Sequence, residues 1–163
     1  MKSRSTPRQG GFTLIELMVT TAILLILMVV GFPAMSDLIR DQRVKTGVNE
    51  LYISLAYARS EAIKRNASVV LTSNTAGNWK DGWTIASGGT TFRNQTALTG
   101  VSITGPNSIT YGRDGRLSDS TAPTLVVSSS QSTTIKARCV RLDLSGRPNI
   151  KQDTNGNAAD GCQ

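Results

Sequence analysis

Few residues of this 163-residue chain could do chemistry, and they form no catalytic constellation. The sequence contains no His, no plausible pair of nucleophile and base, no phosphate-cradling glycine loop and no metal cluster of reliable spacing. Residues 153–157 place oxygen ligands at alternate positions, as a calcium loop does, but Ala158 stands where such a loop needs Gly, and a twelfth-position Glu is lacking. We expect no enzyme, no metal site and no cofactor, and interpret residues 153–157 as a polar tail.

Glu16 is the chemically anomalous residue, because it lies in an almost wholly apolar run from Phe12 to Phe32. As a helix, this run would be about 31 Å long, which is enough to cross the hydrocarbon layer of a membrane once. A carboxylate so deep in an apolar segment costs about 2.5–3.5 kcal/mol or more, and such residues are functional candidates by default. The alternative is an ordinary membrane helix that carries a buried, protonated Glu.

The residues ahead of the apolar run predict its orientation. Lys2, Arg4 and Arg8 precede it, and basic residues stay on the cytoplasmic side. We therefore expect residues 12–33 to form a transmembrane helix, with the N-terminus inside and the remainder exported. Gly10-Gly11 precedes the run, whereas an ordinary secretory signal has a shorter apolar centre followed by its cleavage site.

The two cysteines, Cys139 and Cys162, both lie near the C-terminus. Outside the cytoplasm, two cysteines in a chain that has no others usually form a disulfide. A metal site would need two further ligands that the sequence does not offer. The sequence therefore predicts a disulfide between Cys139 and Cys162.

Basic residues in the C-terminal part form a candidate surface for an anionic partner. Between Thr133 and Leu144 the alternation of apolar residues slips by one position, which predicts a β-bulge near Cys139-Val140. Such a bulge would place Lys136, Arg138 and Arg141 on a common outer face, although a merely solvated strand face has the same pattern. The net charge is +7, of which Lys2, Arg4 and Arg8 contribute three, so a product that starts at Phe12 carries +4.

The elements that position these residues are one long stem and a β-rich domain. Residues 34–66 are predicted to continue the helix amphipathically and to stop at Asn66. The apolar stripe of this segment packs on the chain's own sheet or on a coiled-coil partner, and consists of Val44, Val48, Leu51, Leu55, Ala58 and Ala62. Residues 67–163 change to a period of two. Strands are predicted at 68–72, 82–86, 90–93, 101–104, 108–111, 124–128 and 133–144, with a loop at 74–81 and a hairpin turn at Gly88-Gly89. The expected fold is α+β, with the long N-terminal membrane-spanning helix packed on antiparallel sheets.

The N-terminal segment resembles the processing and assembly motif of type IV pilins and type II secretion pseudopilins. The resemblance rests on the sequence Gly11-Phe12-Thr13-Leu14-Ile15-Glu16, on the short basic leader before it and on the unbroken apolar helix after it. The resemblance implies that residues 1–11 are a leader, that a prepilin peptidase cleaves between Gly11 and Phe12, and that Phe12 is N-methylated. The new α-amino group of one subunit could then neutralise Glu16 of its neighbour, which makes the carboxylate costly alone and stable in a fibre.

Later segments, in their order, resemble the GspH/FimT branch of the pilin superfamily, to which FimU-like minor pilins belong. They are Tyr57-Ala58-Arg59-Ser60-Glu61-Ala62-Ile63, Trp79-Lys80-Asp81-Gly82-Trp83, Tyr111-Gly112-Arg113-Asp114-Gly115-Arg116 and Ser145-Gly146-Arg147. The resemblance implies a minor pilin or pseudopilin that assembles with other subunits, near the tip, in a bacterial type IV pilus or type II secretion system. Before assembly it would be a single-pass protein of the inner membrane with a periplasmic domain.

The resemblance also leaves a binding role open. Some FimT-like members bind DNA during uptake through arginines at the C-terminal Gly-Arg motif. Here that motif is Gly146-Arg147-Pro148-Asn149, in which Asn149 replaces a second arginine. Lys136, Arg138, Arg141 and Lys151 are the residues that could substitute, since phosphate contacts depend on charge more than on residue identity.

Overall fold

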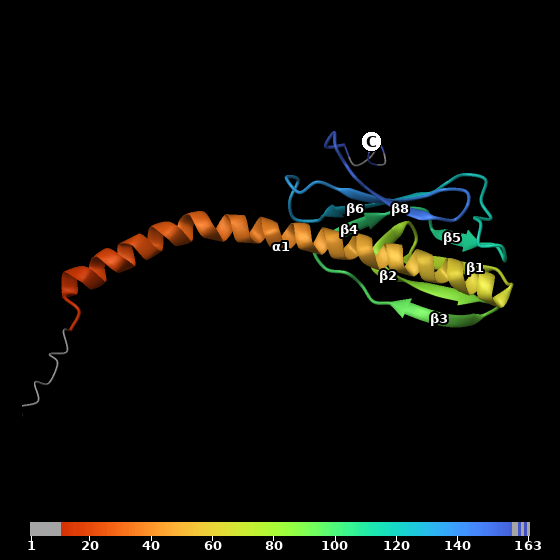
Figure 1. The fold of residues 1–163 in the computed structure, drawn as a ribbon, viewed down its shortest axis with the longest axis horizontal. Helices are drawn as coiled ribbons and strands as arrows, with labels where there is room; N and C mark the ends of the chain where they lie inside the picture. The colour runs from red at the N-terminus through yellow and green to blue at the C-terminus, as the bar shows by residue number, and fades with distance from the viewer. Residues whose placement is uncertain (1–10, 158–159, 161, 163) are drawn as a thin grey trace, which may run out of the picture. The chain divides into compact units, whose positions relative to one another are not determined.

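The computed structural model describes residues 11–157, 160 and 162, with the backbone alone at positions 30, 31, 33 and 34. A single long helix, α1 (Leu14–Arg65), comes first in these residues and is followed by strands. The chain divides into two units, Met1–Ser36 and Asp37–Gln163, and each is described by itself (Figure 1). Except for Gly11, the predicted leader lies outside the described residues.

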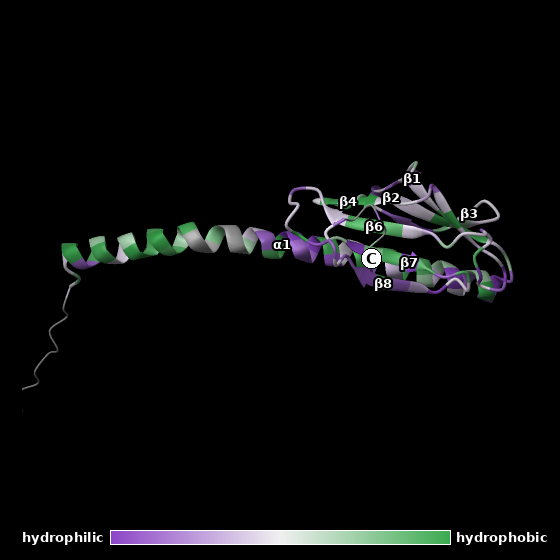
Figure 2. Ribbon diagram, turned by 90° about the horizontal axis from the view of Figure 1, so that it is seen from above, coloured by the Kyte–Doolittle hydropathy of each residue, from purple (hydrophilic) through white to green (hydrophobic). Residues whose placement is uncertain are grey.

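The first unit contains the apolar start of α1. Most residues of this part of the helix are hydrophobic (Figure 2), and Leu14, Leu25 and Val29 are each more than 60% exposed. No helix in the described part of the chain is both long enough and apolar enough to cross a membrane. The expected boundaries at residues 11, 33 and 66 stay predictions.

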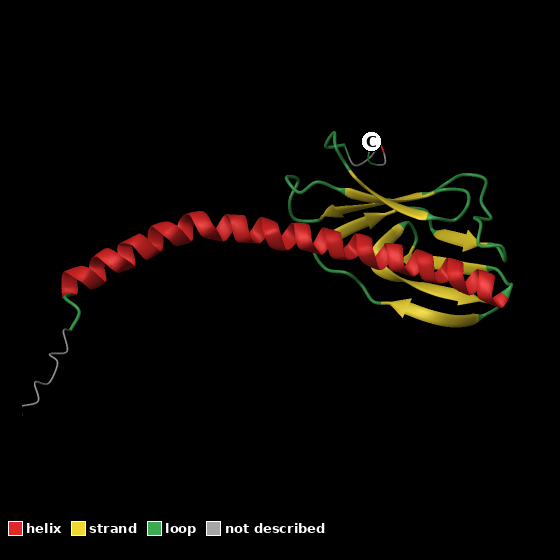
Figure 3. Cartoon of the chain, in the orientation of Figure 1, coloured by secondary structure: helices red, strands yellow, loops and turns green. Residues whose placement is uncertain are grey.

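The second unit is built from the amphipathic part of α1 and one antiparallel sheet (Figures 1 and 3). All six residues of the predicted apolar stripe, from Val44 to Ala62, are buried against the sheet. Gly47 allows a close approach, since a Cβ added there would lie 3.3 Å from Val127 Cγ1. The stripe therefore packs on the chain's own sheet, as the first of the two alternatives predicts.

Helix α1 ends at Arg65, directly before Asn66. Asn66 has a φ of 49°, and the Ala67 backbone N–H donates to the Ala62 carbonyl at 3.2 Å. A left-handed residue just past the last turn is the common way to satisfy the final carbonyls, and Asn tolerates it better than most residues. This ending turns the chain directly into the first strand.

The sheet has the strand order β5-β1-β2-β4-β6-β7-β8, with β3 paired to β2. The predicted α+β fold, a helix packed on antiparallel strands, is confirmed. The strand bounds are β1 (Val69–Thr75), β2 (Asn78–Ser87), β3 (Thr90–Gln95), β4 (Val101–Thr104), β5 (Ser108–Tyr111), β6 (Thr124–Ser129), β7 (Arg138–Leu142) and β8 (Pro148–Gln152).

Two sequence predictions about the strands are wrong. The predicted loop at 74–81 is mostly strand, because β1 and β2 meet in a tight turn at Gly77, and Trp79 is fully buried in β2. The predicted strand at 133–144 is only β7, and β8 was not predicted. β8 starts with Pro and is almost wholly exposed, so it lacks the apolar alternation that marks a strand.

Candidate functional sites in the N-terminal segment and the C-terminal hairpin

Thr13 starts α1 by capping it. The Glu16 backbone N–H lies 3.3 Å from Thr13 Oγ1, and Leu17 N–H donates to the Thr13 carbonyl at 3.2 Å. Thr13 is therefore the N-cap of α1, and Glu16 follows it at the spacing of a capping box. A carboxylate in the first turn also interacts favourably with the positive end of the helix dipole. Glu16 thus has a local role besides the predicted assembly role.

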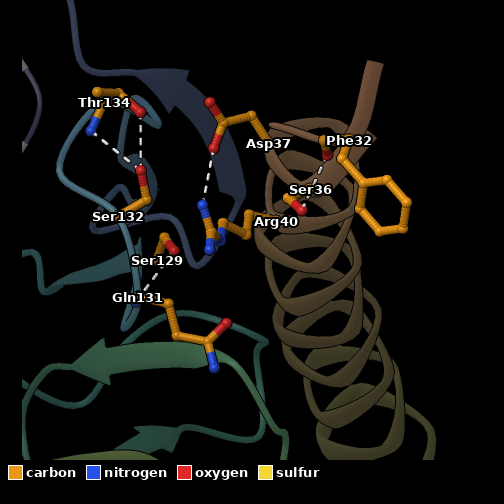
Figure 4. Close-up of polar contacts among 8 residues, drawn as sticks. All are labelled: Phe32, Ser36, Asp37, Arg40, Ser129, Gln131, Ser132 and Thr134. Atoms are coloured by element: carbon orange, nitrogen blue, oxygen red, sulfur yellow. Dashed lines mark hydrogen bonds and ion pairs between the residues drawn. The ribbon is translucent and has the colours of Figure 1, made fainter. Parts of the chain in front are cut away.

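The polar groups of the apolar helix are satisfied within it, with Glu16 as the exception. The hydroxyls of Thr20 and Thr21 both donate to the Leu17 carbonyl, at 3.0 and 2.9 Å, and Ser36 donates to the Phe32 carbonyl at 3.2 Å (Figure 4). Such back-bonding removes the cost of burying these hydroxyls in an apolar environment. The Glu16 side chain is exposed and makes no ion pair with any described residue. Its carboxylate is available to a partner.

The second site lies on the hairpin of β7 and β8, the edge of the sheet. The pairs Arg141↔Asn149 and Cys139↔Lys151 are in continuous register. Residues directly opposite each other share a face, so Arg141 and Lys151 project from the same outer face. Both side chains are exposed.

The predicted β-bulge near Cys139-Val140 is absent, because β7 pairs without a shift with both neighbours. Cys139 and Val140 are both buried for a different reason, namely that both faces of β7 are covered at these two residues. Val140 faces α1 in the core, and the disulfide of Cys139 with Cys162 covers the other face. The disulfide predicted from the sequence is thus present.

Without the bulge, the predicted common face of Lys136, Arg138 and Arg141 does not form. Arg138 alternates with Val140 toward the helix side, where its guanidinium lies 3.8 Å from Asp41 on α1. Lys136 lies within the β6–β7 loop, in which Ser132 and Thr134 form a 2.7 Å hydrogen bond (Figure 4). These two cations therefore belong to other surfaces.

Arg141, Arg147 and Lys151 do come together. They line one hollow of about 570 Å³ on the hairpin, with Leu142, Asp143, Pro148 and Asn149 as the other lining residues. Three cations and one carboxylate share this hollow, which gives it a positive balance. Of the five candidate DNA-binding residues, the structure brings these three together and places Lys136 and Arg138 elsewhere.

Asp143 fixes the turn that presents Arg147, and the sequence analysis did not single it out. Its carboxylate accepts from the Ser145 hydroxyl at 2.6 Å and from the Arg147 backbone N–H at 2.9 Å. These hydrogen bonds, first that of Ser145, hold the pKa of Asp143 below its ordinary value. The signal in the sequence was the Asp-x-Ser-Gly spacing, which is typical of a side-chain-stabilised turn.

Three motif segments of the sequence meet behind this turn. Arg59 on α1 donates from Nε to the Gly115 carbonyl at 3.0 Å. A Cβ at Gly146 would collide with that same carbonyl, and Gly146 has a φ of 79°. Only glycine fits such a close approach in this conformation. The contact fixes the hairpin against α1.

Comparison with known proteins places the chain in a family. Residues 47–146, more than half of the chain, match the family model of the type II transport protein GspH. The chain belongs to the GspH family. Residues 6–32 also match the prokaryotic N-terminal methylation motif. No curated protein matches the chain.

Two crystal structures of the type IV minor pilin FimU from Pseudomonas aeruginosa have a similar fold. One has a TM-score of 0.62 at 21% identity and covers 75% of this chain and 96% of FimU. The other has a TM-score of 0.59 at 23% identity and covers 73% of this chain and 99% of FimU. The prediction of a pilin-like subunit of the GspH/FimT branch is confirmed. Members of such families are structural subunits that assemble with other pilins or pseudopilins.

Proposed function

We propose that this GspH-family chain is cleaved between Gly11 and Phe12 by a prepilin peptidase, methylated on Phe12, and built into a type IV pilus or type II secretion pseudopilus near its tip. The observation that carries the proposal is the match of residues 6–32 to the methylation motif. The apolar side chains that follow support it, because Phe12 is 84% and Leu14 77% exposed in the isolated chain. An exposed apolar surface of this extent needs a membrane or a partner to cover it.

Cleavage and assembly are linked through Glu16. Removal of the leader exposes an amine at Phe12, four residues ahead of the carboxylate. An amine from a neighbouring subunit would neutralise Glu16 in the apolar interior of a fibre, where an unpaired charge is costly. Before assembly the subunit would lie in the bacterial inner membrane, with the N-terminus in the cytoplasm and the sheet domain in the periplasm.

The experiment expresses the full chain with and without a prepilin peptidase and determines the mass of the purified product. The proposal expects a product that starts at Phe12 and carries one methyl group, and that occurs in sheared fibres. Uncleaved protein in the presence of the enzyme would contradict it. Deletion of the gene, scored for protein secretion, twitching and DNA uptake, then distinguishes the pilus from the secretion system.

DNA binding is a second candidate function, and the convergence of Arg141, Arg147 and Lys151 on one hollow favours it. Phosphates of either strand could be held there without sequence preference. Residues 37–163 are suitable for the test because the core cluster and the disulfide both lie within them.

A mobility-shift titration over a salt series tests this candidate. Arg147→Ala should weaken binding and lower the slope of log K against log salt by about 1. Lys136→Ala is the matched control, since it removes the same charge from outside the hollow and should leave binding nearly unchanged. No binding near physiological salt, or equal losses in both variants, would remove this candidate.

A further inference from the structure

A second hollow lies on the other side of Arg147. It has a volume of about 380 Å³ and is lined by Tyr52, Ala56, Arg59, Ser60 and Ile63 of α1 together with Arg147 and Pro148. Arg147 and Pro148 also line the basic hollow of the hairpin. The two hollows are therefore neighbours that meet at the start of β8.

The chemistry of the second hollow differs from that of the first. Tyr52 is 39% and Ile63 51% exposed, so an aromatic and an aliphatic side chain face solvent here. Tyr52, Ala56 and Ser60 follow one another at intervals of four on α1 and therefore lie in one row on its surface. The two small residues of this row leave space beside the tyrosine ring.

The charge of the second hollow suits an anionic ligand. Its charged lining residues are Arg59 and Arg147, and no lining residue is acidic. Arg59 is held in place by its bond from Nε to the Gly115 carbonyl at 3.0 Å. An arginine stays charged at any physiological pH.

We infer that this hollow receives a base of single-stranded DNA, stacked on Tyr52, while the flanking phosphates are held by Arg147 and the basic hollow. Surfaces that bind single strands combine a cationic groove with aromatic rings on which bases stack. In a duplex the bases are stacked on one another and cannot reach Tyr52. The inference rests on the proposed DNA binding of the hairpin and specifies its ligand as the single strand.

The test measures the affinity of residues 37–163 for three labelled probes, which are dT12, a 12-unit abasic strand with the same phosphates, and a 12-base-pair duplex. The expected order is dT12 tighter than either of the others. Tyr52→Ala should weaken dT12 binding roughly fivefold to a hundredfold and leave the abasic strand unchanged. Tyr52→Phe, which keeps the ring, should retain most of the affinity.

A filling variant provides an independent check that does not remove the ring. Ala56→Leu keeps good helix propensity at an exposed position and should occupy the space beside Tyr52. It should weaken dT12 binding and again leave the abasic strand unchanged.

The outcomes separate this inference from the proposed DNA binding. If the chain bound dT12 and the abasic strand with equal affinity, and Tyr52→Ala changed neither affinity, phosphate binding would stand but the stacking site would be overturned. Tighter binding of the duplex would also overturn it. No binding of any probe would reject both. If Tyr52→Ala reduced entry into fibres without changing DNA affinity, the hollow would belong to a neighbouring subunit and the inference would be overturned.

Discussion

Gly146 shows how much of the hairpin's position depends on one residue without a side chain. Its φ of 79° and its approach to the Gly115 carbonyl both exclude a Cβ. Gly156 has the same φ of 79° but has nothing within 4 Å of an added Cβ, so it provides a matched control.

We predict that Gly156→Ala lowers the free energy of unfolding by about 1 kcal/mol, the cost of a left-handed alanine. Gly146→Ala should cost about 1–3 kcal/mol more, because the backbone must also move away from Gly115. Urea denaturation of residues 37–163 measures both values. Equal losses in the two variants would mean that the close approach contributes nothing.

Asp143 should make the stability of the domain depend on acid pH. The pKa of this carboxyl is lowered in the folded state from its ordinary value of 3.8, so the unfolded state binds the proton more readily. Stability from this group is therefore present above that value and is lost as the pH falls through the folded-state pKa.

The variant Asp143→Asn should melt at a lower temperature than the wild type at pH 7, and the difference should shrink between about pH 5 and pH 2. Thermal melts across this range measure it. The exposed Asp119→Asn serves as the control and should change little at any pH. If the melting temperature of Asp143→Asn stayed below that of the wild type at pH 2, the variant would have lost the geometry of the turn rather than the charge.

At the scale of elements, the helix could be predicted better than the hairpin. The apolar stripe from Val44 to Ala62 has a period that only a helix face satisfies, and every member of it is buried. β8 carries no such signal, because it is an exposed edge strand that contains a Pro and a Lys. Neither of its faces is buried, so its sequence lacks the alternation of apolar and polar residues.

The missed hairpin also explains why part of the basic surface was predicted wrongly. Cys139 and Val140 are consecutive apolar residues, and in a strand with one solvated face only a bulge would place both on the core side. In fact the C-terminal tail covers that face through Cys162, and covering of both faces makes alternation uninformative. Arg141, Arg147 and Lys151 could be proposed individually, but their convergence depends on the β7–β8 register.

The disulfide between Cys139 and Cys162 should stabilise this tail and the domain together. It closes a segment with a sequence separation of 23 residues, for which the loss of chain entropy in the unfolded state predicts about 3 kcal/mol. We predict that a reductant lowers the urea midpoint of residues 37–163 accordingly. The double variant Cys139→Ala with Cys162→Ala should start at the lower midpoint and not respond to the reductant; a response there would assign the effect to something else.

On the scale of the whole molecule, one chain combines two different surfaces. Residues 37–163 bury an aliphatic and tryptophan core within a sheet domain, whereas the apolar residues from Phe12 to Phe32 are mostly exposed in the isolated chain. The sheet domain buries its large apolar side chains by itself. The N-terminal segment needs an apolar environment, such as a membrane or the interior of a fibre, to cover its apolar side chains.

The sequence alone could predict this division, because hydropathy and the processing motif are local signals. It could not predict which surfaces of the sheet domain meet partners, since these depend on contacts such as that of Arg59 with Gly115, across 56 positions of the chain. Assembly through the N-terminal segment is therefore the central claim, and Glu16 is its most specific element.

The most direct test is the amount of Glu16→Gln in sheared fibres. Gln can hold the third position of a capping box as Glu does, so the helix start is kept while the charge is removed. The account predicts a variant that is cleaved after Gly11 and reaches the membrane but is absent from fibres. Entry into fibres at the wild-type level would contradict the pairing of Glu16 with a neighbour's amine.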